Sequence, residues 1–110
     1  MQAVSAKKKS EEKREKAGKR DVPDEFALRQ SYPNPVRSQA EIRFDVPEAS
    51  PVRIAAYDVM GREVATLLDK KVQPGRHRVR FAASELPAGV YLYRMQAKDF
   101  ASVRRFVIVK

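Results

Sequence analysis

The chain has 110 residues, a formal net charge of +9 and no cysteine. This length allows one domain with a modest core, and the missing cysteine excludes a disulfide framework, a thiolate nucleophile and zinc sites built on thiolates. No apolar run approaches the roughly 20 residues of a membrane-spanning helix, and the basic start does not look like a signal peptide, so we expect any export instruction to lie elsewhere.

The first 22 residues form a charged leader. Residues 1–20 hold eight Lys or Arg and three Glu, which leaves a net charge of +5. A charge run of this kind is more often a solvated linker than a nucleic-acid arm, and it lacks the aromatic residues on which single strands stack. We therefore predict a flexible linker over 1–22 and a single folded domain over 23–110.

From Asp24 onward, turn signals recur about every 8–12 residues, which is the spacing of an all-β sandwich. No helical period of useful length is present. The strand-like runs occupy residues 25–31, 40–46, 52–58, 62–69, 77–82, 90–97 and 101–110. The sequence thus predicts an Ig-like, seven-stranded antiparallel β-sandwich.

Alternation of apolar and polar residues predicts which side of each strand is buried. The residues expected to face the core are Phe26, Leu28, Ile42, Phe44, Val46, Val52, Ile54, Ala56, Val79, Phe81, Tyr91, Tyr93 and Met95. Gly61 is expected to adopt a positive φ in the turn over 58–61, and Pro74-Gly75 forms a second turn. The less regular run over 62–69 suits an edge strand or a strand with a bulge.

Residues Tyr32-Pro33-Asn34-Pro35 place two prolines just before the second strand. Each proline fixes its own φ, lacks an amide donor and restricts the residue before it, so this stretch cannot be helix or the middle of a ladder. We predict a rigid corner at which the first strand crosses between sheets. In this corner the Tyr32 ring would pack as an anchor and Asn34 would bond its neighbouring backbone.

Residues for catalysis are hard to find. His77 is the only histidine and shares a strand face with core residues, so we interpret it as a partly buried structural residue. No serine lies in a nucleophile-elbow pattern, and the four glycines are too scattered to hold a phosphate. We predict no enzymatic activity, no cofactor and no metal site.

Three arginines at 76, 78 and 80 lie in a row on one strand face. They could meet an acidic partner or an anionic glycan, or they could pair across strands with Glu41, Asp45 or Asp58. We favour the pairing. Tyr91, near the start of its strand, resembles the tyrosine corner of Greek-key sandwiches, in which the hydroxyl bonds upstream backbone.

Several spaced motifs together resemble the C-terminal sorting domains of the type IX secretion system. They are the corner Tyr32 to Pro35, Asp58 with Gly61-Arg62, Leu86-Pro87 with Gly89-Val90-Tyr91, and the terminal apolar strand with Lys110. The resemblance covers about residues 26–110. Relatives often carry a second Asn-Pro and an aromatic after the first, where this chain has Val36-Arg37-Ser38-Gln39.

This resemblance implies a non-catalytic Ig-like domain at the end of a larger exported protein. The domain would direct its upstream cargo through the outer-membrane type IX translocon, to the cell surface or the medium. Translocon components and a sortase-like peptidase would be its partners, without nucleic acid and without membrane insertion, and we expect it to be a monomer.

The resemblance also places the sorting signal in two regions of the chain. Its residues would be Gly89, Tyr91, Arg104, Arg105, Phe106, Val107, Ile108, Val109 and Lys110. A terminal strand with a free end could also be offered as an edge for strand addition.

Two alternatives from other classes remain. One is a purely structural Ig-like module similar to that of flagellar hook-capping proteins, which shares much of the same pattern. The other is a carbohydrate-binding or adhesion module, which would need an exposed row of aromatic residues. The chain has no tryptophan, and most of its Phe and Tyr residues fall on inward positions.

Overall fold

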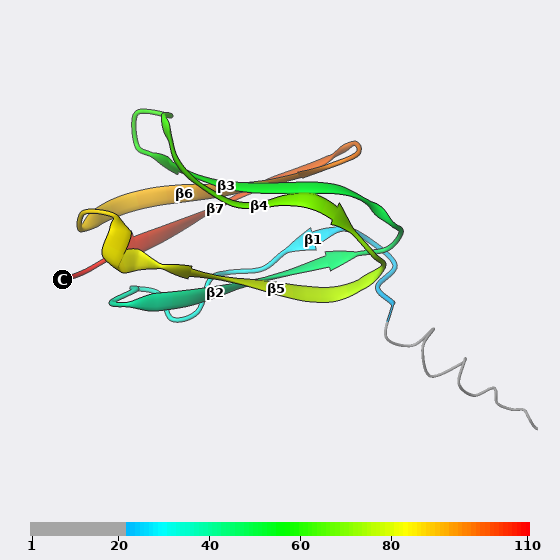
Figure 1. Ribbon diagram of the computed structural model, residues 1–110, viewed down its shortest axis with the longest axis horizontal. Helices are drawn as coiled ribbons and strands as arrows, with labels where there is room; N and C mark the ends of the chain where they lie inside the picture. The colour runs from blue at the N-terminus through cyan, green and yellow to red at the C-terminus, as the bar shows by residue number, and fades with distance from the viewer. Residues whose placement is uncertain (1–21) are drawn as a thin grey trace, which may run out of the picture.

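The computed structural model describes residues 22–110, and two facing β-sheets enclose one core (Figure 1). The seven strands are β1 (Ala27–Leu28), β2 (Gln39–Val46), β3 (Ser50–Asp58), β4 (Glu63–Val72), β5 (Gly75–Ala82), β6 (Gly89–Ala97) and β7 (Phe100–Ile108). The predicted all-β sandwich is therefore confirmed. Apart from Val22, the predicted leader lies outside the described residues.

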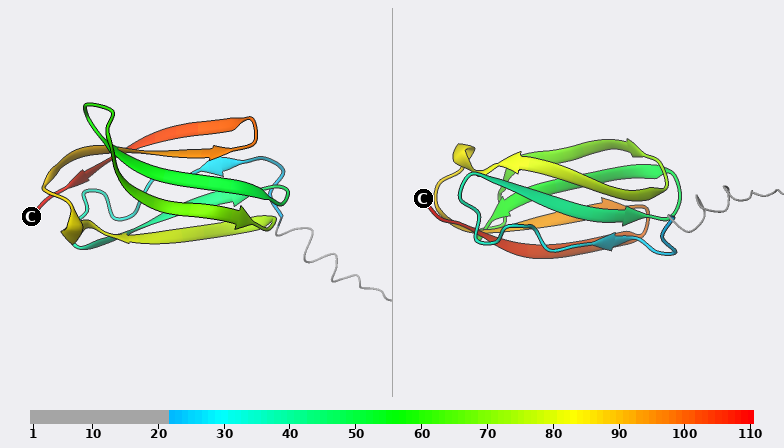
Figure 2. Two further views of the ribbon diagram at one scale, coloured as in Figure 1. Left: turned by 45° about the horizontal axis from the view of Figure 1, so that its top comes forward. Right: turned by 90° about the horizontal axis from the view of Figure 1, so that it is seen from below.

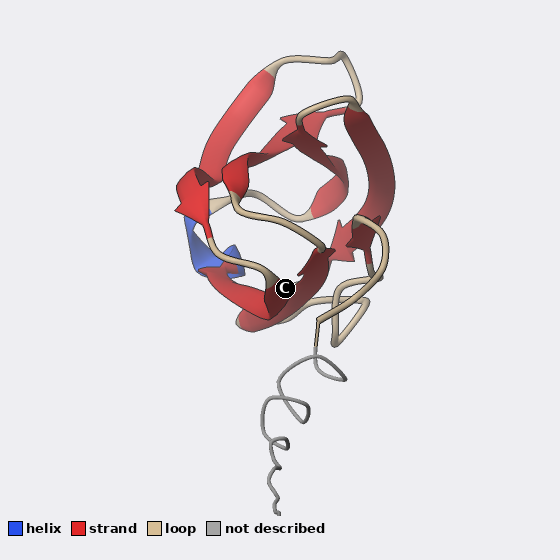
Figure 3. Cartoon of the chain, turned by 90° about the vertical axis from the view of Figure 1, so that its right-hand side faces the viewer, coloured by secondary structure: helices blue, strands red, loops and turns tan. Residues whose placement is uncertain are grey.

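One sheet has three strands in the order β1-β2-β5, and the other has four in the order β4-β3-β6-β7. All the pairings between named strands are antiparallel. The two layers and the connections between them are visible from three further directions (Figures 2 and 3). The helical element of the described region is one short 3₁₀ turn, η2 (Ala83–Glu85), between β5 and β6.

The core lies between the two sheets and is built from the inward positions of their strands. Alternation on β2 and β6 places every second side chain in it, because successive residues of a strand face opposite sides. The largest fully buried side chains are Tyr93, Phe44, Phe106, Ile42, Ile54, Met95, Ile108, Val36, Val46 and Val52. Phe26 and Val79 are only partly buried at its margin.

Several strand boundaries differ from the sequence prediction, including those of β4, which extends to Val72, and β5, which begins at Gly75. The first strand is limited to Ala27–Leu28, although the amides of Arg29 and Tyr32 still donate to carbonyls of β2. Strand β3 already begins at Ser50, so the break after β2 is shorter than expected. The last strand ends at Ile108.

The irregular fourth strand behaves as predicted. β4 is an edge strand, and its register with β3 shifts between Ile54 and Ala55 and again between Ala56 and Tyr57. These two irregularities account for the imperfect alternation of its apolar residues, because each shift moves the following side chains to the other face.

No helix among residues 22–110 is long and apolar enough to cross a membrane.

Candidate functional site

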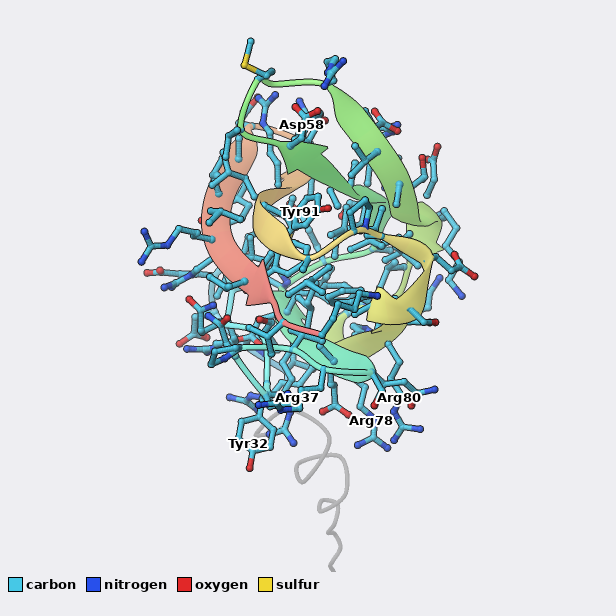
Figure 4. The ribbon with its side chains drawn as sticks, turned by 90° about the vertical axis from the view of Figure 1, so that its left-hand side faces the viewer. Tyr32, Arg37, Asp58, Arg78, Arg80 and Tyr91 are labelled. Carbon is cyan, nitrogen blue, oxygen red and sulfur yellow. The ribbon has the colours of Figure 1, made fainter. Side chains whose placement is uncertain are left out.

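The sequence motifs that are far apart along the chain converge at one end of the sandwich. Asp58, at the end of β3, lies directly opposite Tyr91 of β6, and Gly89 lies opposite Ile108 of β7. The Lys110 ammonium donates to the carbonyl oxygen of Ala83 at 3.3 Å. Asp58 and Tyr91 are seen together in the end view (Figure 4). We call this end, with its β3–β4 turn, the start of β6 and the end of β7, the motif end.

Tyr91 ties the start of β6 to the loop before it. Its hydroxyl donates to the carbonyl oxygen of Pro87 at 2.6 Å, and its ring stacks on Phe106 with centroids 5.4 Å apart. The side chain is buried. The predicted tyrosine corner is thus confirmed, and Tyr91 contributes to the motif end by holding it together.

The predicted signal residues on β7 fall into two sets. Phe106 and Ile108 are buried in the core, where Phe106 also contacts Phe81 and Tyr93 through ring pairs with centroids 5.2 and 5.7 Å apart. Arg104, Arg105 and Lys110 are exposed, and Val107 and Val109 are half-buried. A partner could therefore contact the exposed and half-buried residues directly. The two buried residues instead stabilise the fold that forms this surface.

The proline-containing corner covers the outer edge of β7. Val36 and Ile108 form a parallel bridge, in which Val36 N–H donates to the Val107 carbonyl at 2.7 Å and Val109 N–H donates to the Val36 carbonyl at 2.9 Å. The Asn34 side chain extends this contact, since its Oδ1 accepts from the Val107 amide at 3.0 Å. The sequence predicted that this edge would be free for strand addition. In the structure, Asn34 and Val36 of the corner occupy it.

The corner crosses between the sheets as predicted. Tyr32 forms a bridge with Glu41 of β2 in the three-stranded sheet, and Val36 pairs with β7 in the four-stranded sheet. The Tyr32–Pro33 and Asn34–Pro35 peptide bonds are both cis.

Two details of the corner prediction are wrong. The Tyr32 ring does not pack as an anchor, because it is 79% exposed. Asn34 does not bond its neighbouring backbone, but reaches the backbone of Val107 and Arg105 instead. The anchoring tyrosine is Tyr93, whose hydroxyl donates to the Arg29 carbonyl at 2.7 Å from the buried core.

Asp58 holds the β3–β4 turn through one carboxylate. Its Oδ1 accepts from the amides of Met60 and Arg62 at 2.9 and 3.0 Å, and its Oδ2 accepts from Arg62 Nε at 2.9 Å. Gly61 has a φ of +87°, as predicted, and a β-carbon there would meet no atom within 4 Å, so the need for glycine is conformational.

This turn presents an apolar tip that sequence reasoning missed. Val59 and Met60 are 69% and 76% exposed. Two apolar residues in a tight turn have no core to enter, and this is the sequence signal for an exposed apolar tip.

The turn should loosen in acid. Hydrogen bonds from the Arg62 backbone and side chain hold the pKa of Asp58 below its usual range. A carboxylate with a lowered pKa stabilises the fold above its unfolded pKa of about 3.9, and this contribution is lost as the pH falls through the folded value. We expect the Met60 and Arg62 amide resonances to titrate with a midpoint below that value in NMR spectra. Asp58→Asn should abolish the titration, and an unshifted midpoint would contradict the assigned role.

Chemistry for catalysis does not assemble in the described part of the chain. No group of three or more His, Asp or Glu side chains there could hold a metal ion. His77 stacks on Phe44 with ring centroids 5.5 Å apart, and its Nε2 lies 2.7 Å from the Gln73 carbonyl oxygen. This agrees with the structural role predicted for it.

The arginine row pairs with only part of the predicted set. Glu41 Oε1 lies 3.5 Å from Arg80 and 4.0 Å from Arg78, as expected. Asp45 pairs with Arg29 and lies directly opposite Arg76 on β5, whereas Asp58 pairs with Arg62 at the far turn. The pKa of Glu41 is lowered, chiefly by its hydrogen bond from Arg43.

The chain matches the model of a known family. Residues 30–110, most of the chain, match the family described as "Secretion system C-terminal sorting domain". The comparison with curated proteins finds no match.

Proposed function

The chain belongs to the family of C-terminal sorting domains of the type IX secretion system, and we propose that the secretion machinery reads this signal from the motif end of the folded sandwich. The domain is a non-catalytic secretion signal for an upstream cargo. Such cargo is secreted, or attached to the cell surface via the outer membrane.

Convergence of the motifs is the observation that supports this proposal. Asp58 lies on β3, whereas Gly89 and Tyr91 lie on β6, and the pairing of β6 with β3 and β7 brings them together with the end of β7. A surface assembled from such distant residues exists only after the domain has folded. Reading it would allow the machinery to accept complete domains and to reject unfolded chains.

Within the motif end, we assign direct contact to the exposed residues and support to the buried ones. Arg105 and Lys110 present charged side chains to solvent, whereas Tyr91, Phe106 and Ile108 are buried. Arg104 has a mixed role, because its Nε donates to the Leu28 carbonyl at 3.0 Å. Components of the outer-membrane translocon would bind this surface, and a sortase-like peptidase could act afterwards.

A reporter fusion tests the sorting role. The reporter, with its own signal peptide, is placed before the 110-residue chain and expressed in a type IX-competent bacterium. We expect the reporter at the cell surface or in the medium, and in the periplasm of a strain whose translocon is inactive. Periplasmic retention in the competent strain, with the domain folded, would reject the role.

A single charge reversal tests the assigned contact surface. Arg105→Glu should reduce export several-fold, because it reverses an exposed charge that the machinery would contact. The backbone carbonyl of residue 105, which accepts a hydrogen bond from the Gln30 side chain, is unchanged by the substitution. Arg94→Glu on the neighbouring strand is the matched control and should export normally. Deleting 105–110 is expected to abolish export, but it also removes Phe106 and Ile108 from the core. Equal export by the two point variants would show that Arg105 is not part of the signal.

The two alternative functions receive less support. A carbohydrate-binding face needs a row of exposed aromatic rings, and within residues 22–110 Tyr32 is the single aromatic residue that is clearly exposed. A purely structural hook-capping module would share the fold, but the family match is to sorting domains.

A further inference from the structure

Five arginines share the outer face of the three-stranded sheet, on the side away from the core. They are Arg29, Arg43, Arg76, Arg78 and Arg80, and we call them the arginine face. The side chains of Arg29, Arg43, Arg78 and Arg80 are 57–69% exposed. Arg78 and Arg80 are seen together at the same side of the molecule (Figure 4).

Glu41 and Asp45 form the ion pairs of Arg29, Arg43, Arg78 and Arg80, and Arg76 has contacts of its own. Glu41 contacts Arg43, Arg78 and Arg80, with Nε or Nη to Oε distances of 2.9, 4.0 and 3.5 Å. Asp45 pairs with Arg29. One carboxylate shared among three arginines does not neutralise them, so positive charge is left over on the sheet.

The arrangement is unfavourable for the fold alone. Arg43 and Arg78 are direct cross-strand partners, and Arg29 bonds the Arg43 backbone from the other side. Like charges directly opposite one another destabilise a sheet. Charges on the edge strand β5 could be explained as protection against aggregation, but β2 is the central strand of its sheet, so that explanation does not cover Arg43.

An open groove runs beside four of these five arginines. Its volume is about 730 Å³, and it is lined by Arg29, Arg43, Asp45, Arg76, His77 and Arg78. Pockets that bind ligands commonly measure about 300–1,000 Å³. There is space beside the arginines for a bound segment.

The spacing of the arginines favours one kind of anion. Alternate residues of a strand are roughly 6.6–6.8 Å apart on one face, and this is the separation of Arg76, Arg78 and Arg80 along β5. An extended peptide with acidic residues at alternate positions has the same repeat. Guanidinium groups bind carboxylates through paired hydrogen bonds, so matched spacing allows several pairs at once.

Two other polyanions fit less well. A bilayer surface is usually bound through charge together with exposed apolar residues. The apolar tip at Val59 and Met60 adjoins Asp58, which lies on the opposite side of the molecule from Arg78 and Arg80 in Figure 4. Single-stranded nucleic acid is usually bound on several aromatic platforms among basic residues, and this face offers one exposed aromatic ring, that of Tyr32 beside Arg43 and Arg80.

We propose that the arginine face binds an acidic, extended segment of a partner protein, with carboxylates at alternate positions along β5. This interaction is separate from the signal at the motif end and does not depend on it.

Peptide binding to the full 110-residue chain tests the proposal. The probe is a labelled peptide of about eight residues that alternates glutamate and threonine, and the comparison peptide has the same composition with its glutamates contiguous. Fluorescence anisotropy at about 0.15 M salt, where exposed charges are screened beyond about 8 Å, reports affinity. We expect the alternating peptide to bind more tightly and to shift the amide resonances of β2 and β5 in NMR spectra.

Charge-matched variants locate the site. The triple variant Arg76→Gln, Arg78→Gln and Arg80→Gln should bind the alternating peptide roughly tenfold more weakly, since it loses three exposed ion pairs. The control removes three charges elsewhere, through Lys70→Gln, Lys71→Gln and Arg94→Gln, and should bind normally. The triple lysine variant at 76, 78 and 80 keeps the charge and should have intermediate affinity.

The charged leader is present in every variant, so its contribution cancels in the comparison. Equal binding of the two peptides, or equal loss in the two glutamine variants, would overturn the proposal. It would also be overturned if vesicles rich in anionic phospholipid bound through the three arginines while the peptide did not.

Discussion

Replacing Phe106 by alanine is expected to lower the free energy of unfolding by about 3–5 kcal/mol, the usual cost of truncating a buried aromatic residue. Phe106 is fully buried, and its ring contacts those of Phe81, Tyr91 and Tyr93. The substitution leaves a cavity where both sheets meet. Chemical denaturation followed by circular dichroism measures the loss.

Val103→Ala is the control on the same strand. Val103 is 52% exposed, so its truncation should have an effect within about 0.5 kcal/mol. Because the motif end requires the packed ring of Phe106, we expect the alanine variant to lose export of a fused reporter as well. Wild-type stability for Phe106→Ala would contradict the assignment of this ring to the centre of the core.

Removal of the Tyr91 hydroxyl is the second large expected effect. Tyr91→Phe should lower the free energy of unfolding by about 0.5–1.5 kcal/mol, the net contribution of a typical hydrogen bond, because the Pro87 carbonyl loses its donor while the ring stays in place. Thermal and denaturant unfolding would measure it, and hydrogen exchange should show the loss concentrated in residues 86–90.

Tyr93→Phe is a matched comparison, since it also removes a buried hydroxyl that donates to a backbone carbonyl. Its stability loss should be similar, but the increased hydrogen exchange should appear in the corner near Arg29. If Tyr91→Phe instead abolished export at unchanged stability, Tyr91 would be a contact residue of the machinery, and our assignment of it to support would be wrong.

Tyr93 also predicts an upper pH limit. Burial raises the pKa of its hydroxyl above the usual value. A group whose folded pKa is raised stabilises the fold below its unfolded pKa, and the stability decreases as the pH rises above about 10. Denaturation across alkaline pH should show this decrease in the parent chain and a smaller one in Tyr93→Phe.

The division between buried and exposed signal residues has a consequence for type IX sorting. Phe106 and Ile108, two of the predicted signal residues on β7, are core residues, so substitutions there change recognition by changing the fold. Export assays on such variants must therefore include a measurement of folding. Arg105 is the more informative position, because its side chain can change without disturbing the packed face.

The strands and the side of each strand that is buried could be predicted from the sequence. Alternation on β2, β3 and β6 identified Ile42, Ile54 and Tyr93 as core residues, because a period of two is a local property of the chain. The turn at Gly61 and the tyrosine corner followed in the same way from short-range chemistry. The family resemblance rested on these same residues.

The partners of polar side chains could not be predicted in this way. Asn34 contacts Val107, Arg29 pairs with Asp45, and one glutamate serves three arginines, and each contact depends on how distant segments are placed when the sheets close. Sequence periodicity says which way a side chain points from its own strand, but not what lies there. The amino-acid sequence alone thus determined the sandwich and its core, while the tertiary structure decided that the corner covers β7 and that positive charge gathers on one sheet.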